Sequence, residues 1–329
     1  MFRAMTCWHA LVFIVALPLC IHAQDKKDAV TDPAKADADF AVQGEYTGEL
    51  PSNEGKEKWG IQVIALGDGK FDGVGYKGGL PGDGWDRGEK AKGHGETAGG
   101  VTTLVGDKGN AKIKDGVMTV VDKDGNEIGQ LKRVIRKSPT LGAKPPQGAV
   151  VLFDGKTADH FINGRMTEDD LLLQGVTSKQ KFQNLTLHLE FVIPYMPHDR
   201  GQGRGNSGCY LQGRYEVQIL DSFGLEGKNN ECGGIYSIRD PDVNMCFPPL
   251  SWQTYDIDYT PAKYDDSGKK IKNAVMTVRH NGVVVHENVA LPKDTTAAPV
   301  KEGPEPGPIF LQDHGNPVRF RNIWLVEKK

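Results

Sequence analysis

The chain has 329 residues, a formal net charge of −3 and 41 glycines. A charge this close to balance gives no basic surface for a nucleic acid partner, so nucleic acid binding is excluded as the main role. Valine, threonine, tyrosine and phenylalanine alternate with polar residues in many short runs, which favours strands and turns over long helices. The length leaves room for two domains.

The first residues have the layout of a secretory signal peptide. Arg3 precedes an apolar run from Ala10 to Cys20, and a small-residue exit ends at Ala23. The run is about eleven residues, shorter than the roughly 20 that a membrane-spanning helix needs. We therefore expect cleavage of residues 1–23, export to the periplasm or the outside, and no transmembrane segment. Lipid attachment at Cys20 is the alternative.

Composition divides the remaining chain into four segments. Residues 24–40 are polar and rich in alanine, aspartate and lysine, which predicts a disordered tether. Short strand-like runs within 41–137 predict a small antiparallel β domain, with a glycine-rich loop over 78–100. Residues 138–148 hold three prolines and two glycines and read as a linker. Strand-like runs recur at short intervals over 149–329, which predicts a second, all-β domain of jelly-roll sandwich type.

The apolar–polar alternation within two of these runs assigns side chains to faces. Along 185–193 the odd-numbered residues are apolar and belong to the core, so Glu190 lies on the opposite, polar face. Along 214–221 the same period leaves Glu216 and Gln218 on the polar face. If the two strands are neighbours, Glu190 and Glu216 share a cleft in which a sugar could bind. The alternative is an ordinary solvated sheet face.

Two loops of the second domain carry further candidate residues. Residues 203–208 form a GxGxxG pattern around Asn206, but the pattern precedes a strand and has no βαβ context, so it does not indicate a dinucleotide site. The long loop over 194–205 is expected at the edge of the cleft. His314 lies in a glycine-bordered loop, where an imidazole can serve as a general base or a metal ligand. An uninvolved loop is the alternative in both cases.

Three cysteines remain after the signal peptide: Cys209, Cys232 and Cys246. In an oxidising compartment Cys232 and Cys246 are the better candidates for a disulfide, although spacing does not fix the connectivity. Because the sequence has no CxxC spacing, a zinc site built from cysteines is not expected.

Four motifs of the second domain resemble a known family. They are LFDGKTADHF from residue 152, NSGCYLQGRYEVQILDS from 206, CGGIY from 232 and GPIFLQDHGNPVRFRNIWL from 307. In this order they resemble the 3-keto-disaccharide hydrolase family, whose members are also described as 3-keto-glucoside 1,2-lyases and 3-keto-2-hydroxyglucal hydratases. The resemblance covers about 149–329 and implies a concanavalin-like jelly roll and a small-molecule carbohydrate substrate. It does not extend to the first domain.

The chemistry that this resemblance implies needs a base, an acid and donors to oxygen. A ketone at C3 of a sugar acidifies the proton at C2, so that a base can remove it and the group at C1 can leave. We expect Glu216 and His314 to be the base and acid pair, with Asn206, Gln218 and Arg321 as donors to the substrate. Glu190 is a weaker substrate-binding candidate. A divalent cation at the ketone would suit the reaction, but no ligand set stands out and no other cofactor is indicated.

Two other functions fit the same sequence. One is a conventional glycoside hydrolase, which needs two carboxylates about 5–9 Å apart and for which Glu190 and Glu216 are the candidates. The other is a carbohydrate-binding or adhesion module without catalysis, since one fold hosts both classes.

Overall fold

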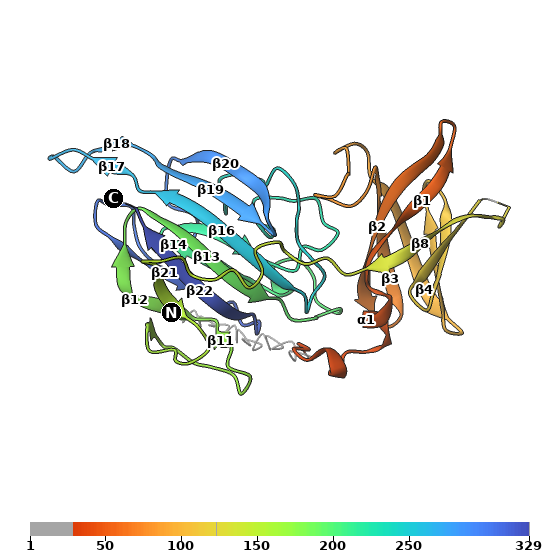
Figure 1. Cartoon of the computed structure of the whole chain (residues 1–329), viewed down its shortest axis with the longest axis horizontal. Helices are drawn as coiled ribbons and strands as arrows, with labels where there is room; N and C mark the ends of the chain where they lie inside the picture. The colour runs from red at the N-terminus through yellow and green to blue at the C-terminus, as the bar shows by residue number, and fades with distance from the viewer. Residues whose placement is uncertain (1–28, 123, 329) are drawn as a thin grey trace, which may run out of the picture.

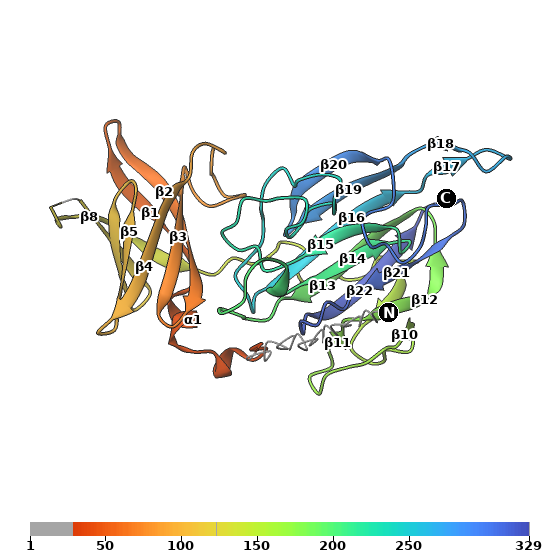
Figure 2. The same cartoon turned by 180° about the vertical axis from the view of Figure 1, so that it is seen from behind.

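The structure is a computed structural model that describes residues 29–122 and 124–328. The predicted signal peptide lies outside the described residues. Within them, no helix is long and apolar enough to cross a membrane. Two β units lie side by side along the long axis of the molecule, a barrel and a sandwich (Figure 1; Figure 2 shows the opposite side).

The first unit is a closed barrel in which each strand pairs with the next along the chain and the last pairs with the first. Its strands are β1 (Gly44–Ser52), β2 (Gly55–Gly67), β3 (Lys70–Lys77), β4 (Ala91–Ala98), β5 (Val101–Gly106), β6 (Asn110–Lys114), β7 (Val117–Val121) and β8 (Glu127–Val134). Closure leaves no free sheet edge. All eight strands fall within the segment 41–137.

The expected loop over 78–100 is partly wrong, because its last third forms strand β4. Gly93 and Gly95 alternate with exposed polar residues and face the barrel interior. A Cβ at Gly95 would lie 2.2 Å from the backbone oxygen of Thr103, so the neighbouring strand approaches too closely for any side chain. These glycines therefore mark close strand packing rather than a loop.

The expected disordered tether needs a similar correction over its described part. Residues 33–35 form a 3-10 helix and Ala38–Val42 form helix α1. Asp37 caps α1 through the backbone N–H of Phe40 and also accepts a hydrogen bond of 2.8 Å from Tyr195 Oη of the sandwich. These residues are polar in composition but ordered, because their carboxylates have specific partners.

The second unit is a sandwich of two antiparallel sheets, as predicted. The five-stranded sheet has the order β10 (Phe161–Ile162), β12 (Val176–Phe182), β21 (Gly307–Leu311), β14 (Ser207–Leu211) and β15 (Tyr215–Ile219). The seven-stranded sheet has the order β11 (Leu172–Leu173), β22 (Arg319–Glu327), β13 (Leu185–Val192), β16 (Trp252–Thr260), β19 (Ala274–His280) and β20 (Val283–Leu291), with β9 (Val150–Phe153) pairing beside β22. Two short strands, β17 (Lys263–Tyr264) and β18 (Lys270–Lys272), form a separate hairpin, and Gly201–Gly203 is a 3-10 helix.

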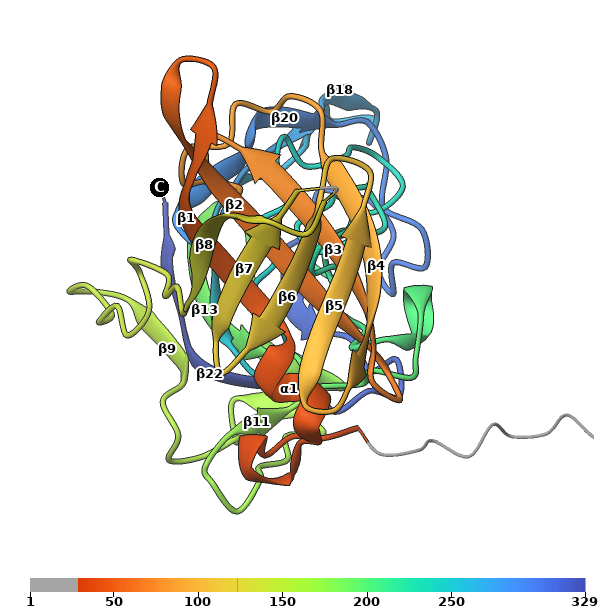
Figure 3. The same ribbon diagram turned by 90° about the vertical axis from the view of Figure 1, so that its right-hand side faces the viewer.

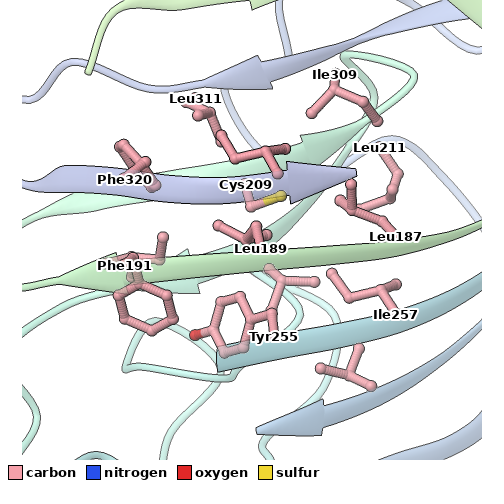
Figure 4. Close-up of a cluster of buried hydrophobic side chains, with 14 of the residues drawn as sticks. Leu187, Leu189, Phe191, Cys209, Leu211, Tyr255, Ile257, Ile309, Leu311 and Phe320 are labelled. Carbon is pink, nitrogen blue, oxygen red and sulfur yellow. The ribbon is translucent and has the colours of Figure 1, made fainter. Parts of the chain in front are cut away.

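The core of the sandwich lies between the two sheets. Figure 4 shows side chains of β13 and β16 meeting those of β14 and β21. Leu187, Leu189 and Phe191 all point into this core, as the alternation along 185–193 predicts. The same period places Cys209 and Leu211 of β14 and Tyr215 and Val217 of β15 inside, so the residues that alternate with them, such as Tyr210 and Glu216, point away from the core.

The barrel and the sandwich are packed against each other. Phe223 of the sandwich lies in a buried cluster with Ile64, Val74 and Tyr76 of the barrel wall. Figure 3 shows the barrel in front of the sandwich, with α1 at one end of the barrel. The outer face of β2 and β3 is therefore apolar because it is an interface between the two units.

The barrel also fixes the long loop between β13 and β14, residues 194–206. The Arg200 guanidinium donates to the backbone oxygen of Leu66 at 2.9 Å, and the Arg204 guanidinium donates to that of Ala65 at 3.3 Å. Both acceptors lie in β2, so a strand of the barrel fixes a loop of the sandwich.

Candidate active site

The outer face of the five-stranded sheet is polar where β14 and β15 pair. Gly208 lies opposite Gln218 and Tyr210 lies opposite Glu216 in the register of these strands. Because Cys209 and Val217 point into the core, these four residues share the face that points away from it. The prediction that Glu216 and Gln218 share a polar face is confirmed.

Glu216 is a buried carboxylate with little hydrogen bonding. Its side chain is 2% exposed, and Tyr210 Oη donates a hydrogen bond of 2.7 Å to Oε2. A Cβ at Gly208 would lie 2.1 Å from Glu216 Oε1, so the carboxylate occupies the space that a side chain would fill. Burial raises the pKa of Glu216 to about 8, although the hydrogen bond from Tyr210 offsets part of the rise. The group therefore exchanges its proton near neutral pH, which suits a general acid or base.

Three side-chain amides form a network beside Glu216. Gln218 Nε2 donates to Gln202 Oε1 at 3.1 Å, and Asn206 Nδ2 donates to the backbone oxygen of Gln202 at 2.8 Å. The side-chain oxygens of Asn206 and Gln218 are buried and have no hydrogen-bond partner among the described residues. A buried amide oxygen without a partner is costly. Each of these two oxygens therefore has unused capacity to accept a hydrogen bond.

Further residues extend the face toward β21. Gln312 Nε2 donates to Tyr210 Oη at 3.3 Å, and the Gln312 backbone N–H donates to the Gly208 oxygen at 2.9 Å. The rings of Tyr210 and Phe310 lie 5.3 Å apart. Aromatic rings next to planar amides are a suitable lining for a sugar, whose ring has an apolar face and hydroxyl edges.

Sequence reasoning missed Tyr210, Gln202 and Gln312. Tyr210 could have been found, because the alternation around Cys209 places it on the polar face. Gln202 comes from the 194–206 loop, whose position is set by contacts with β2 of the barrel and with distant residues of the sandwich such as Asn230. Nothing in the local sequence signals it.

His314 lies at the exposed end of this region. It follows β21 in an exposed stretch, two residues beyond Gln312, and in the described part of the chain no hydrogen bond joins it to Glu216. The same loop is tied to the site by Asn316, whose Oδ1 accepts a hydrogen bond of 2.7 Å from the Asn206 backbone N–H. The structure thus brings the His314 loop against the site, with the His314 side chain exposed.

The expectation that Glu190 and Glu216 share a cleft is wrong. Glu190 lies on β13, which pairs with β16 and β22 of the seven-stranded sheet, so the two carboxylates project from opposite outer faces of the sandwich. Arg321 lies beside Glu190, with Nε 2.7 Å from Oε2, and the Gly142 backbone N–H of the 138–148 linker donates to Oε1 at 2.5 Å. The predicted substrate-binding roles of Glu190 and Arg321 at the Glu216 site therefore have no geometric support.

The surroundings of Glu190 shift its pKa in the opposite direction to that of Glu216. Burial alone would raise its pKa, but hydrogen bonds with His188, Asn322, Arg321 and the linker lower the pKa to about 2. Glu190 is thus a permanently ionised group that joins the linker to the seven-stranded sheet.

Neither a metal centre nor a disulfide is formed in the described residues. They contain no cluster of three or more His, Cys, Asp or Glu side chains that could hold a metal ion. Cys209, Cys232 and Cys246 are free and buried, and Cys232 and Cys246 are hydrogen-bonding neighbours. Their oxidation to a disulfide stays a prediction.

The β-sandwich and the amide-lined carboxylate fit a carbohydrate-active enzyme, and comparisons with known proteins support this class. Residues 148–326 match the model of the 3-keto-alpha-glucoside-1,2-lyase-like domain. The chain belongs to this family.

Solved structures similar to the chain come from Parabacteroides distasonis ATCC 8503. One, described as a "putative glycosyl hydrolase", is 34% identical with a TM-score of 0.51, and the match covers 56% of this chain and 85% of that one. Another with the same description is 18% identical with a TM-score of 0.41 and covers 60% of this chain and 99% of that one. A comparison with curated proteins found no match.

Proposed function

We propose that the chain is an exported enzyme that cleaves 3-keto-glycosides, with Glu216 as the base that removes the proton at C2. The observation that carries the proposal is a nearly fully buried carboxylate with a pKa of about 8, beside two unpaired amide oxygens. The family of the chain supports the substrate class.

The first step is removal of a proton from carbon. The ionised Glu216 takes the C2 proton, and the electron pair of the C2–H bond forms a C2–C3 double bond while the ketone becomes an enolate. A carboxylate with a raised pKa is a stronger base than an ordinary one, which favours this step. The side-chain oxygens of Asn206 and Gln218 would accept hydrogen bonds from sugar hydroxyls, and the Gln312 amide N–H would donate to the substrate.

The second step expels the aglycone. The enolate collapses to the ketone, a C1–C2 double bond forms and the C1–O bond breaks, so the aglycone oxygen leaves with the electron pair and takes up a proton. His314, from the loop that Asn316 ties to the site, is the candidate donor of this proton. Water then adds to the resulting enone at C1, and the sum of both steps is hydrolysis.

The decisive experiment compares a 3-keto-disaccharide with the same disaccharide unoxidised, each incubated with purified protein with and without EDTA. Release of the aglycone from the keto sugar alone, with exchange of the C2 proton in D2O, supports the proposal. Cleavage of both sugars would replace it with ordinary glycoside hydrolysis. Binding without turnover would replace it with a carbohydrate-binding role. Loss of activity in EDTA would add a metal ion to the mechanism.

Two variants separate the role of Glu216 from a general effect of charge. Glu216→Gln should abolish both aglycone release and C2 exchange, because the amide has no basic oxygen. Glu287→Gln makes the same change at an exposed position of β20 on the other sheet and should leave the activity unchanged. Equal activity of the two variants would remove Glu216 from the mechanism.

Export is tested separately from catalysis. The mature protein recovered from the periplasm or medium of a bacterial host should begin at Gln24, which mass spectrometry of the intact chain would show. Retention of the full-length chain in the cytoplasm would contradict the proposal.

A further inference from the structure

The barrel contains a cavity at the end opposite α1. Its volume is about 270 Å3, and it is lined by residues from all eight strands and by the turn over 106–110. The α1 end is filled by large buried side chains, among them Tyr46, Phe71, Met118 and Leu131. The two ends of one barrel therefore differ: one is packed and the other is hollow.

Glycines account for the hollow end. Gly73 and Gly75 of β3, Gly93 of β4 and Gly106 at the end of β5 line the cavity where the α1 end has bulky residues. A Cβ at Gly75 would already touch Ala91 at 3.2 Å and Trp59 at 3.6 Å. An eight-stranded barrel has an interior that is either filled by side chains or able to hold one small ligand. The hollow end of this barrel is of the kind that can hold one small ligand.

The lining of the cavity is apolar and includes an indole. Trp59, Ile61, Leu104 and Val120 contribute side chains, and the glycines contribute flat backbone surface. Trp59 is only partly buried, although it packs against the barrel core. A flat apolar molecule between Trp59 and the glycine backbone would complete the burial of the Trp59 indole.

The lysines at the rim of the cavity already have carboxylate partners. Lys92 Nζ lies 3.0 Å from Glu226 Oε1 of the sandwich, and Lys108 Nζ lies 3.3 Å from Glu89 Oε2. An anionic ligand would have to compete with these pairs, whereas an uncharged one would not. The rim therefore favours a neutral occupant.

We propose that the barrel binds one small, uncharged aromatic molecule of one or two rings in this cavity. An apolar cavity of about 150 Å3 is enough for benzene, so the larger volume here accommodates a second ring. The proposal concerns the barrel alone and is independent of the chemistry at Glu216.

The test uses the whole mature protein and the neutral dye N-phenylnaphthylamine, whose fluorescence rises in apolar surroundings. We expect saturable binding of one dye per chain, with energy transfer from Trp59. The sulfonated analogue, anilinonaphthalene sulfonate, has nearly the same shape and adds a negative charge, so it should bind more weakly. Absence of dye binding, or equal binding of both dyes, would overturn the proposal.

Two matched tryptophan substitutions on β4 locate the dye. Ala91→Trp fills the cavity and should weaken binding at least about tenfold, or about 1.4 kcal/mol. Ala98→Trp makes the same change at the exposed end of the strand, outside the cavity, and should bind as the wild type does. If Ala91→Trp does not fold, Trp59→Phe replaces the indole with a smaller ring and should lower the energy transfer, with Trp85 near the rim as the remaining donor. Binding that survives Ala91→Trp unchanged, or energy transfer that stays at the wild-type level in Trp59→Phe, would place the dye elsewhere and refute the proposal.

Discussion

Replacing Glu216 by glutamine should stabilise the protein at alkaline pH. The folded pKa of Glu216 is about 8 against a value of 4.5 for an ordinary glutamate. Because the folded pKa is the higher one, its contribution to stability is complete below about pH 4.5 and is lost as the pH rises to about 8. At about 1.4 kcal/mol per pKa unit, the full loss is on the order of 5 kcal/mol. Glu216→Gln has no ionisable side chain at this position, so it does not lose this stability as the pH rises.

The assay is urea or thermal unfolding of the wild type and of Glu216→Gln between pH 5 and pH 9. Their stabilities should converge near pH 5, while at pH 9 the variant should be more stable. For a domain of this size each kcal/mol corresponds to about 2–4 °C in Tm, so the difference in Tm is on the order of 10 °C. Glu287→Gln, at an exposed site, should follow the wild type. Parallel pH profiles of wild type and Glu216→Gln would show that the carboxylate is not held in its neutral form, and the reasoning about the site would fail.

Three more predictions concern other parts of the sandwich. Gly208→Ala should lower kcat/KM at least about tenfold and destabilise the fold by about 1–3 kcal/mol, since its Cβ would lie 2.1 Å from the site carboxylate; wild-type kinetics would contradict this. Glu190→Ala should cost about 1–3 kcal/mol in urea unfolding because it leaves the Gly142 backbone N–H and the Asn322 amide without their acceptor, while kcat of the folded protein stays unchanged; a selective loss of kcat would instead place Glu190 in the mechanism. Cys232 and Cys246 should form a disulfide in protein exported to an oxidising compartment, so that one thiol rather than three reacts after denaturation without reductant; three reactive thiols would rule the bond out.

The alternation of apolar and polar residues correctly predicted on which face of its strand each side chain lies. It did not predict to which sheet each strand belongs. It placed Glu216 with Gln218 because neighbouring side chains in one strand are related by a period of two. The same period put Glu190 on a polar face, and this is also correct. It carries no information on strand order, however, so it could not tell that β13 and β15 belong to different sheets.

Contacts between distant segments explain what else the sequence did not predict. The 24–40 segment has the composition of a disordered chain, yet Asp37 is fixed by Tyr195, which is far away in sequence. Strand β4 was not predicted because glycine ordinarily weakens strands. In this barrel Gly95 is required by the approach of a neighbouring strand, which only the closed structure reveals.

The hydrogen bonds from the 194–206 loop to β2 bear on how this protein can be divided. The family match over 148–326 invites expression of the sandwich as a separate fragment. Such a fragment would retain every strand that carries Glu216, but Arg200 and Arg204 would lose their acceptors in the barrel. The loop that presents Gln202 would keep its contacts within the sandwich, such as the hydrogen bond of 2.8 Å from Gln202 Nε2 to the Asn230 backbone oxygen, but would lose those that fix it to β2. We therefore expect a fragment that includes the barrel to hold this loop more firmly than the family domain alone does.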